Sequence, residues 1–405
     1  MKSQLSIITQ ITDNHHLIQD SVVDLKRNIM KRISKLASVV LISFLLWFCS
    51  GDDDTTNPDT GEPVEATKVL VETLSVPWEL IWGPDNFLWV TERNGKISRI
   101  NPDSGEQQLI FTIPNVSQVG ESGLLGMVLH PNFDTNPYVY VVYTYNGGSG
   151  LLERLVQFTY ANNTLTNETI LIDQIPANSN HDGSRLLITP SMHLIMTTGD
   201  AGNTNLSQDM NSLGGKVLRL NLDGTIPSDN PFTNSYVYSL GHRNAQGLVL
   251  HPNGKLYSSE HGPSSDDEIN IIQSGKNYGW PDVKGKIDTP NEQAFAASTE
   301  VIESIFEWTP TIAPSDLIYY TSDKIPEWTN KLLMTVLKDQ RIIALTLNSD
   351  GTAITQEEVF FNGKFGRLRD IAVSPQGRIF IATNGNSYGD TSSTHRIIEI
   401  NKIEK

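Results

Sequence analysis

One phrase repeats along the chain and limits the folds open to it. It consists of an aliphatic run, a proline, a polar turn usually with Gly or Asn, and a second run rich in aliphatic and aromatic residues. Proline fixes φ at the turn entry, Gly or Asn supplies the permissive position, and the flanking composition favours β-strands. Five copies are plain, with turn prolines at Pro84, Pro131, Pro190, Pro252 and Pro375.

The intervals between these prolines suggest that one copy is hidden. They are 47, 59, 62 and 123 residues, and the last is close to twice the one before. We therefore expect a sixth copy near residues 331–351. Six four-stranded units in about 340 residues predict an all-β fold, a six-bladed β-propeller of four-stranded antiparallel blades. A large β-sandwich is the alternative.

The N-terminal segment has a different character. Lys31, Arg32 and Lys35 precede a 13-residue apolar run, residues 36–48, which ends at Cys49. The run is short for a membrane span, and a basic segment followed by such a run is typical of an export signal. A lone cysteine at its end resembles a bacterial lipoprotein signal, although an ordinary signal peptide with an unmodified Cys49 is also open.

These features predict three parts. Residues 1–49 are expected to be an N-terminal extension and lipoprotein-type signal, with Met1 or Met30 as the start. Residues 50–65 are expected to be an acidic flexible tether, and residues 66–405 the propeller. The protein is then predicted to be exported to the bacterial cell envelope, periplasm or outer membrane, with a lipid anchor at Cys49.

Composition narrows the partners. The formal net charge is −16 and the chain has one cysteine. Nucleic-acid binding is driven by clustered Lys and Arg, so this charge argues against a nucleic-acid partner. With a single cysteine the predicted mature chain has no internal disulfide, and its stability must come from packing.

Polar clusters interrupt the strand pattern at the edges of successive repeats. In a propeller, loops at one end of every blade converge, so these residues can share one site. At least four positively charged side chains gathered in an acidic protein predict an anionic ligand. The cluster members are His181 and Asp200, then Arg243, Asn244 and Gln246, then Gly262 and Pro263 with Asp266 and Asp267, and finally Lys338, Arg367 and Arg369.

One of these clusters can also hold a metal ion. The carbonyls of Gly262 and Pro263 beside two aspartates are hard oxygen ligands, which suit Ca²⁺ better than a transition metal. No Cys or paired-His spacing indicates zinc.

The same residues carry a resemblance to a known family. "NHDGSRL…TTGDAGN", "GGKVLRLNLDGTIPSDNPF", "GHRNAQGL", "EHGPSSDDEINII…GKNYGWP", "APSDLIYY" and "GRLRD" resemble the pyrroloquinoline quinone (PQQ) dependent glucose/sorbosone dehydrogenases, which include the aldose sugar dehydrogenases. The motifs occur in family order from Val76 to about Ile400. The resemblance implies a quinoprotein that oxidises aldose sugars at C1 to lactones and passes electrons to a quinone or a carrier protein.

The resemblance also implies roles for individual residues. His181 would be the general base and Asp200 the group that orients it. Arg243, Asn244, Lys338, Arg367 and Arg369 would contact PQQ, and Gly262 and Pro263 would bind the calcium ion. Trp308, Asp182 and Gln246 are expected at the sugar site.

Two residues depart from the family pattern. His261 stands where soluble glucose dehydrogenase has Gln, and Asp182 replaces a neutral residue next to His181. The chain also lacks some longer loops of that enzyme, so glucose specificity and dimerisation do not follow. The sequence also allows two other functional hypotheses. One is a calcium-dependent propeller lactonase, which the Arg/Lys cluster disfavours, and the other is a non-catalytic sugar-binding or adhesion propeller.

Overall fold

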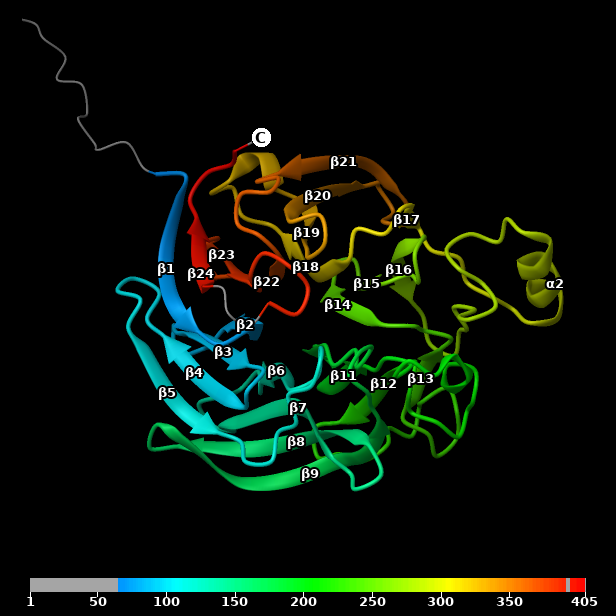
Figure 1. Ribbon diagram of the computed structural model, residues 1–405, viewed down its shortest axis with the longest axis horizontal. Helices are drawn as coiled ribbons and strands as arrows, with labels where there is room; N and C mark the ends of the chain where they lie inside the picture. Colours follow the sequence, from blue (N-terminus) through cyan, green and yellow to red (C-terminus); the bar gives the residue numbers. More distant parts are fainter. Residues whose placement is uncertain (1–64, 391–393, 405) are drawn as a thin grey trace, which may run out of the picture. The chain divides into compact units, whose positions relative to one another are not determined.

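The protein is described by a computed structural model that covers residues 65–390 and 394–404. The predicted signal and residues 50–64 of the predicted tether lie outside the described residues. Figure 1 shows six sheets arranged as blades around a common centre. The predicted six-bladed propeller of four-stranded antiparallel blades is therefore confirmed.

In the first five blades, four strands follow one another in sequence from the inside of the ring outward. Blade 1 is β2 (Pro77–Trp82), β3 (Leu88–Glu92), β4 (Lys96–Ile100) and β5 (Gln107–Thr112). Blade 2 is β6 (Leu124–Leu129), β7 (Tyr138–Asn146), β8 (Leu151–Ala161) and β9 (Thr164–Pro176). Blade 3 is β10 (Leu186–Ile188), β11 (His193–Thr197), β12 (Lys216–Asn221) and β13 (Val237–Leu240).

The remaining blades complete the ring. Blade 4 is β14 (Ala245–Leu250), β15 (Leu256–Glu260), β16 (Asp267–Ile272) and β17 (Phe306–Trp308). Blade 5 is β18 (Pro314–Tyr320), β19 (Lys331–Val336), β20 (Arg341–Leu347) and β21 (Ile354–Phe360). Blade 6 is β22 (Leu368–Val373), β23 (Ile379–Thr383), β24 (His395–Ile400) and, as its outer strand, β1 (Thr67–Leu74).

Blade 6 closes the ring because it combines the two ends of the described chain. β1 pairs antiparallel with β24, from Thr67 opposite Ile400 to Leu74 opposite His395. The inner strand β22 contacts β2 of blade 1, and the other neighbouring inner strands also contact one another. Pairing of the first strand with the last gives blade 6 its fourth strand and joins the two ends of the described chain in one sheet.

The sixth copy of the repeat is real, but the prediction near residues 331–351 misplaced it by one hairpin. Those residues form β19 and β20, whereas in the other blades the proline turn joins the first and second strands. The equivalent turn joins β18 and β19 and contains a 3-10 turn, Pro326–Trp328, with Trp328 fully buried. This longer, Trp-anchored loop hides the Pro-Gly signature.

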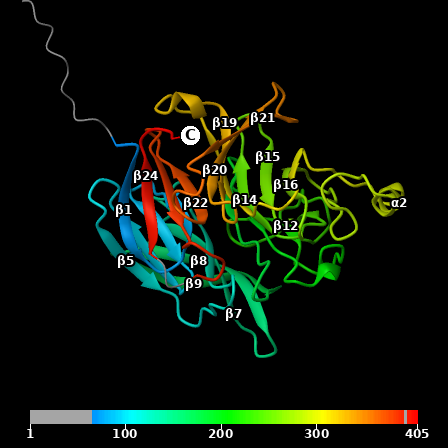
Figure 2. The ribbon, with the colours of Figure 1, turned by 45° about the horizontal axis from the view of Figure 1, so that its top comes forward.

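Apolar side chains from neighbouring blades interlock to form the core. Trp89 and Ile97 of blade 1, for example, pack with Met127 and Val141 of blade 2. The described residues contain no helix long and apolar enough to cross a membrane. The α-helix α2 (Pro290–Ser298) lies in the β16–β17 connection, and Figures 1 and 2 both place it at the periphery of the ring.

Candidate active site

The predicted site residues gather at one end of the propeller because of the blade topology. Each inner strand begins at this end, which we call the mouth, and the connection between the second and third strand returns to it. Asp182, Arg243 and Arg367 stand just before inner strands, and Asp200, Gly262 and Lys338 lie in second-to-third connections. Residues far apart in sequence are thereby brought to one face.

His181 and Asp200 form a close pair. His181 Nδ1 lies 2.7 Å from Asp200 Oδ1, and the Asp200 side chain is almost fully buried. The second oxygen of Asp200 accepts the indole N–H of Trp280 at 2.9 Å. A carboxylate only accepts hydrogen bonds, so we assign the proton of the neutral imidazole to Nδ1, and Nε2 is the nitrogen with a free lone pair.

The turn that carries His181 is conformationally demanding. His181 has φ of +62°, and Gly183 and Ser184 are also in the positive region. A Cβ atom on Gly199 would lie 1.7 Å from the His181 carbonyl oxygen, so glycine is required there. A non-glycine residue at positive φ is uncommon and is enriched at functional sites.

Asp182 is buried and its carboxylate is bound by neighbouring loops. It is 4 % exposed, and its carboxylate accepts hydrogen bonds from Ser122 Oγ at 2.7 Å and Asn178 N at 3.0 Å. Burial raises the pKa of the Asp182 carboxyl to about 6. The residue therefore supports the loop beside His181, and its predicted contact with sugar is still a prediction.

Arg369, Gln246 and Asn244 form a continuous buried layer. Arg369 Nη1 donates to Gln246 Oε1 at 2.7 Å, and Gln246 Nε2 donates to Asn244 Oδ1 at 3.0 Å. Burial lowers the pKa of the Arg369 guanidinium to about 9. Asn244 Nδ2 and the Nε of Arg243 are buried without a partner among the described residues. A buried donor without a partner costs folding free energy. These two N–H groups would therefore be satisfied by a ligand that carries hydrogen-bond acceptors.

The other two predicted cations, Arg367 and Lys338, each contact a residue of their own. The Arg367 guanidinium stacks over the ring of Tyr388 with its carbon 5.8 Å from the centroid. Lys338 is exposed, and its ammonium donates to the carbonyl and hydroxyl of Thr311 at 2.5 and 3.1 Å. Lys338 is thus held by the connection between blades 4 and 5.

Glu121 is a member of the site that the sequence analysis missed. Its Oε2 accepts the His181 amide at 3.4 Å. Burial alone would raise the pKa of Glu121, but the charges of His261 and Arg369 outweigh it and hold the pKa below its ordinary value. Glu121 precedes the inner strand β6, the position that His181–Arg185 and Arg367 occupy in their blades, and repeat position is the signal that could have found it.

Gly262 and Pro263 lie in a tight turn that can present carbonyl oxygens. Gly262 N donates to Asp267 Oδ1 at 2.7 Å, and a Cβ on Gly262 would lie 2.0 Å from the Ser265 carbonyl oxygen. In the adjacent β16, burial and the charge of Glu260 raise the pKa of Glu268 to about 8.

The groups at this turn are more suited to a hard cation bound by backbone carbonyl oxygens than to a metal ion held by several side chains. Glu307 Oε2, on β17 of the same blade, is buried without a partner among the described residues. No group of three or more His, Cys, Asp or Glu within the described ranges is arranged to hold a metal ion. A cation at this turn would therefore depend on the carbonyls and on a bound ligand.

Trp308 lies opposite Asp267, the residue that binds the Gly262 amide, and its predicted contact with sugar is still a prediction. It ends β17, the outer strand of blade 4, and packs in the core between blades 4 and 5 with Ile269, Leu317 and Met334. Its indole N–H donates to Glu357 Oε2 at 3.2 Å. These contacts are those of a core residue.

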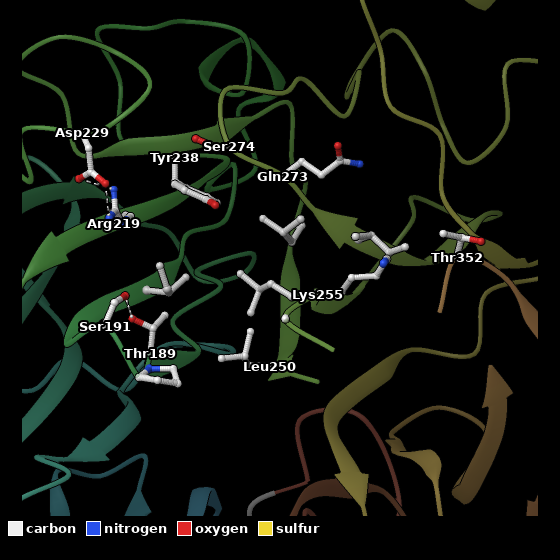
Figure 3. A pocket seen from close by; sticks show the side chains of 16 residues that line it. Thr189, Ser191, Arg219, Asp229, Tyr238, Leu250, Lys255, Gln273, Ser274 and Thr352 are labelled. Carbon is white, nitrogen blue, oxygen red and sulfur yellow. Dashed lines mark hydrogen bonds and ion pairs between the residues drawn. The ribbon is translucent and has the colours of Figure 1, made fainter. Parts of the chain in front are cut away.

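A large cavity lies elsewhere, at the end opposite the mouth. It has a volume of about 860 Å³ and is lined by the β10–β11 turn at Ser191 and the β14–β15 turn at Lys255. Figure 3 shows Arg219 on its wall facing Asp229, its ion-pair partner at 2.9 Å. No predicted site residue lines this cavity.

Comparisons with known proteins identify the family to which the chain belongs. The family model described as "Glucose / Sorbosone dehydrogenase" matches residues 74–390. Quinoprotein glucose dehydrogenase B of Acinetobacter calcoaceticus is 34% identical over 82% of this chain and 88% of its own length. Aldose sugar dehydrogenase of Escherichia coli is 32% identical, covering 79% and 90%.

Solved structures give the same result. The PQQ-bound form of aldose sugar dehydrogenase from Streptomyces coelicolor is 32% identical, with a TM-score of 0.71 over 84% of this chain and 98% of that one. The family model covers residues 74–390, and both curated relatives match about four fifths of the chain at more than 30% identity. The chain belongs to the glucose/sorbosone dehydrogenase family.

Proposed function

We propose that the protein is a PQQ-dependent, calcium-requiring dehydrogenase that oxidises aldose sugars at C1 to lactones. The observation that carries this function is the His181–Asp200 pair beside unpaired donors of Arg243 and Asn244. Such a site combines a general base with hydrogen-bond donors that can bind an anion. The names of the relatives, which are quinoprotein and aldose sugar dehydrogenases, support the choice of cofactor and substrate.

His181 supplies the base. Its Nε2 would accept the proton of the sugar C1 hydroxyl as hydride leaves C1, and Asp200 would stabilise the imidazolium that forms. When bound, PQQ supplies the quinone that takes the hydride. Gln246 and the buried layer would hold the reactants at a fixed distance and exclude water.

The cations would bind and orient the cofactor. PQQ carries three carboxylates, and guanidinium groups pair with carboxylates in a forked geometry. Arg243, Arg367 and Arg369, with Asn244 and Lys338, are the proposed set. The Gly262 and Pro263 carbonyls would hold Ca²⁺, which acts as a Lewis acid toward a ligand oxygen. Electrons would pass on to a quinone or a carrier protein.

The test is reconstitution. A chain from about residue 52 onward is purified without cofactor, and dye reduction is followed with a panel of aldoses after addition of PQQ and Ca²⁺. We expect activity that needs both additions and disappears in His181→Ala. An unchanged PQQ spectrum and melting temperature on mixing would reject the dehydrogenase and favour a non-catalytic sugar-binding propeller.

We also propose that the protein is exported and anchored through a lipid on Cys49. The basic segment, apolar run and single cysteine support this. In cells, Cys49→Ser should move the protein from the membrane fraction to the soluble fraction. Equal membrane content of the two forms would reject the anchor.

A further inference from the structure

A buried carboxylate outside the predicted set joins the two halves of the site. Glu260 is the last residue of β15 and is 4 % exposed. Its Oε1 accepts the backbone N–H of Arg243 and, at 3.2 Å, that of Asn244. The β14–β15 ladder ends where Ala245 faces Glu260, so the carboxylate satisfies the two amides just beyond the ladder.

The second oxygen of Glu260 is held by a histidine. Oε2 lies 3.0 Å from Nδ1 of His242, whose Nε2 lies 2.8 Å from Ser239 Oγ. His242 is fully buried and stacks on Tyr278 with ring centroids 4.6 Å apart. Since Glu260 only accepts in this network, the His242 proton is assigned to Nδ1. Hydrogen bonds to both oxygens therefore fix the orientation of the Glu260 carboxylate.

The held backbone connects directly to the predicted base. The Arg243 carbonyl accepts the amide of Asp200 at 2.8 Å, and Asp200 orients His181. Asn244 Oδ1 accepts the amide of Gly183 at 3.1 Å, two residues beyond His181. One carboxylate thus fixes the segment that presents Arg243 and also supports both sides of His181.

We propose that Glu260, held by His242, is a positioning residue that sets the cation arm Arg243–Asn244 and the His181–Asp200 pair in register. The inference rests on the proposed function. It goes beyond that function in assigning a role to a carboxylate that binds the backbone amides of the site and His242. Partners of this kind typically change affinity or activity by about 10- to 100-fold when removed.

The first measurement uses the chain without cofactor. Hydrogen–deuterium exchange is followed by mass spectrometry in peptides that cover residues 198–203 and 241–246. In Glu260→Ala, both peptides should exchange faster. Glu260→Gln should retain most of the protection, because an amide oxygen can still accept from the backbone while its nitrogen donates to a neutral His242 of the other tautomer.

Glu399→Ala is the matched control. Glu399 is 6 % exposed and binds Arg378 at 2.7 Å in blade 6, close to the strand ends opposite the mouth. It should lower the melting temperature without changing exchange in the two mouth peptides.

The second measurement is an absorbance titration of each variant with PQQ and Ca²⁺, followed by steady-state kinetics. In Glu260→Ala, PQQ affinity should fall about tenfold and kcat should fall more than KM rises. Unchanged exchange and affinity, with only a lower melting temperature, would overturn the positioning role. Failure of the wild type to bind PQQ would reject the proposed function instead, and the exchange result would still decide whether Glu260 orders the mouth.

Discussion

At the scale of single residues, Asp200 is the clearest point at which geometry sets chemistry. Its two oxygens bind His181 Nδ1 and Trp280 Nε1. Asn has one acceptor oxygen, so in Asp200→Asn either His181 or Trp280 would face an amide N–H, and the carboxylate charge that stabilises the imidazolium would be lost. We expect kcat to fall by about 100-fold or more. Asp173→Asn, in the surface ion pair with Arg154, is the control and should leave kcat unchanged. Equal rates in all three proteins would contradict the role.

Asp182 makes a prediction about pH and stability. Its pKa is about 6 in the folded chain, against about 3.9 when unfolded, so the folded state binds more protons in this range. Its contribution therefore favours folding at low pH and is lost as the pH rises from about 4 to about 6. Asp182→Asn should flatten the fall in melting temperature over that window. A parallel fall in variant and wild type would show that Asp182 does not titrate there.

At the scale of elements, the connections at the mouth tolerate little change. Alanine at Gly199 would force its Cβ into the His181 carbonyl, whereas Gly150, in the β7–β8 turn, has nothing within 4 Å of an added Cβ. Gly199→Ala should unfold the mouth or lower the melting temperature strongly, and Gly150→Ala should be close to neutral. Circular dichroism melts of both variants decide this, and similar melting temperatures would contradict it.

The strands also show which parts of the fold could be predicted from the sequence. Proline turns and aliphatic runs are local, so they predicted five blades directly. The sixth repeat was misplaced because Trp328 and its 3-10 turn replace the usual short turn. Glu121 and Glu260 were missed for another reason. Glu121 contacts His181, 60 residues away, and Glu260 contacts Asn244, 16 residues away. No local pattern marks such contacts, and for Glu121 only its position in the repeat could have indicated the site.

At the scale of the whole molecule, the ring depends on its first strand. β1 covers the outer edge of blade 6 by pairing with β24. A chain that starts after Leu74 would leave β24 paired only with β23 and would expose its outer edge, and an exposed edge strand promotes association. We expect such a truncation to melt at a lower temperature and to elute from a sizing column as larger species. A monomeric truncation with the wild-type melting temperature would show that blade 6 closes without β1.

The propeller also explains how an acidic protein can hold an anion. With a net charge of −16, attraction by the molecule as a whole is excluded, and only local gathering of Arg243, Arg367 and Arg369 at the mouth can supply it. We propose that these side chains bind PQQ next to a working base. The most direct measurement is a single turnover, in which an aldose is added to the PQQ- and Ca²⁺-loaded chain without an electron acceptor. We predict that one equivalent of bound PQQ is reduced, seen in its absorbance spectrum, and that His181→Ala binds PQQ but does not reduce it. Bound PQQ that stays oxidised with every aldose would contradict the account.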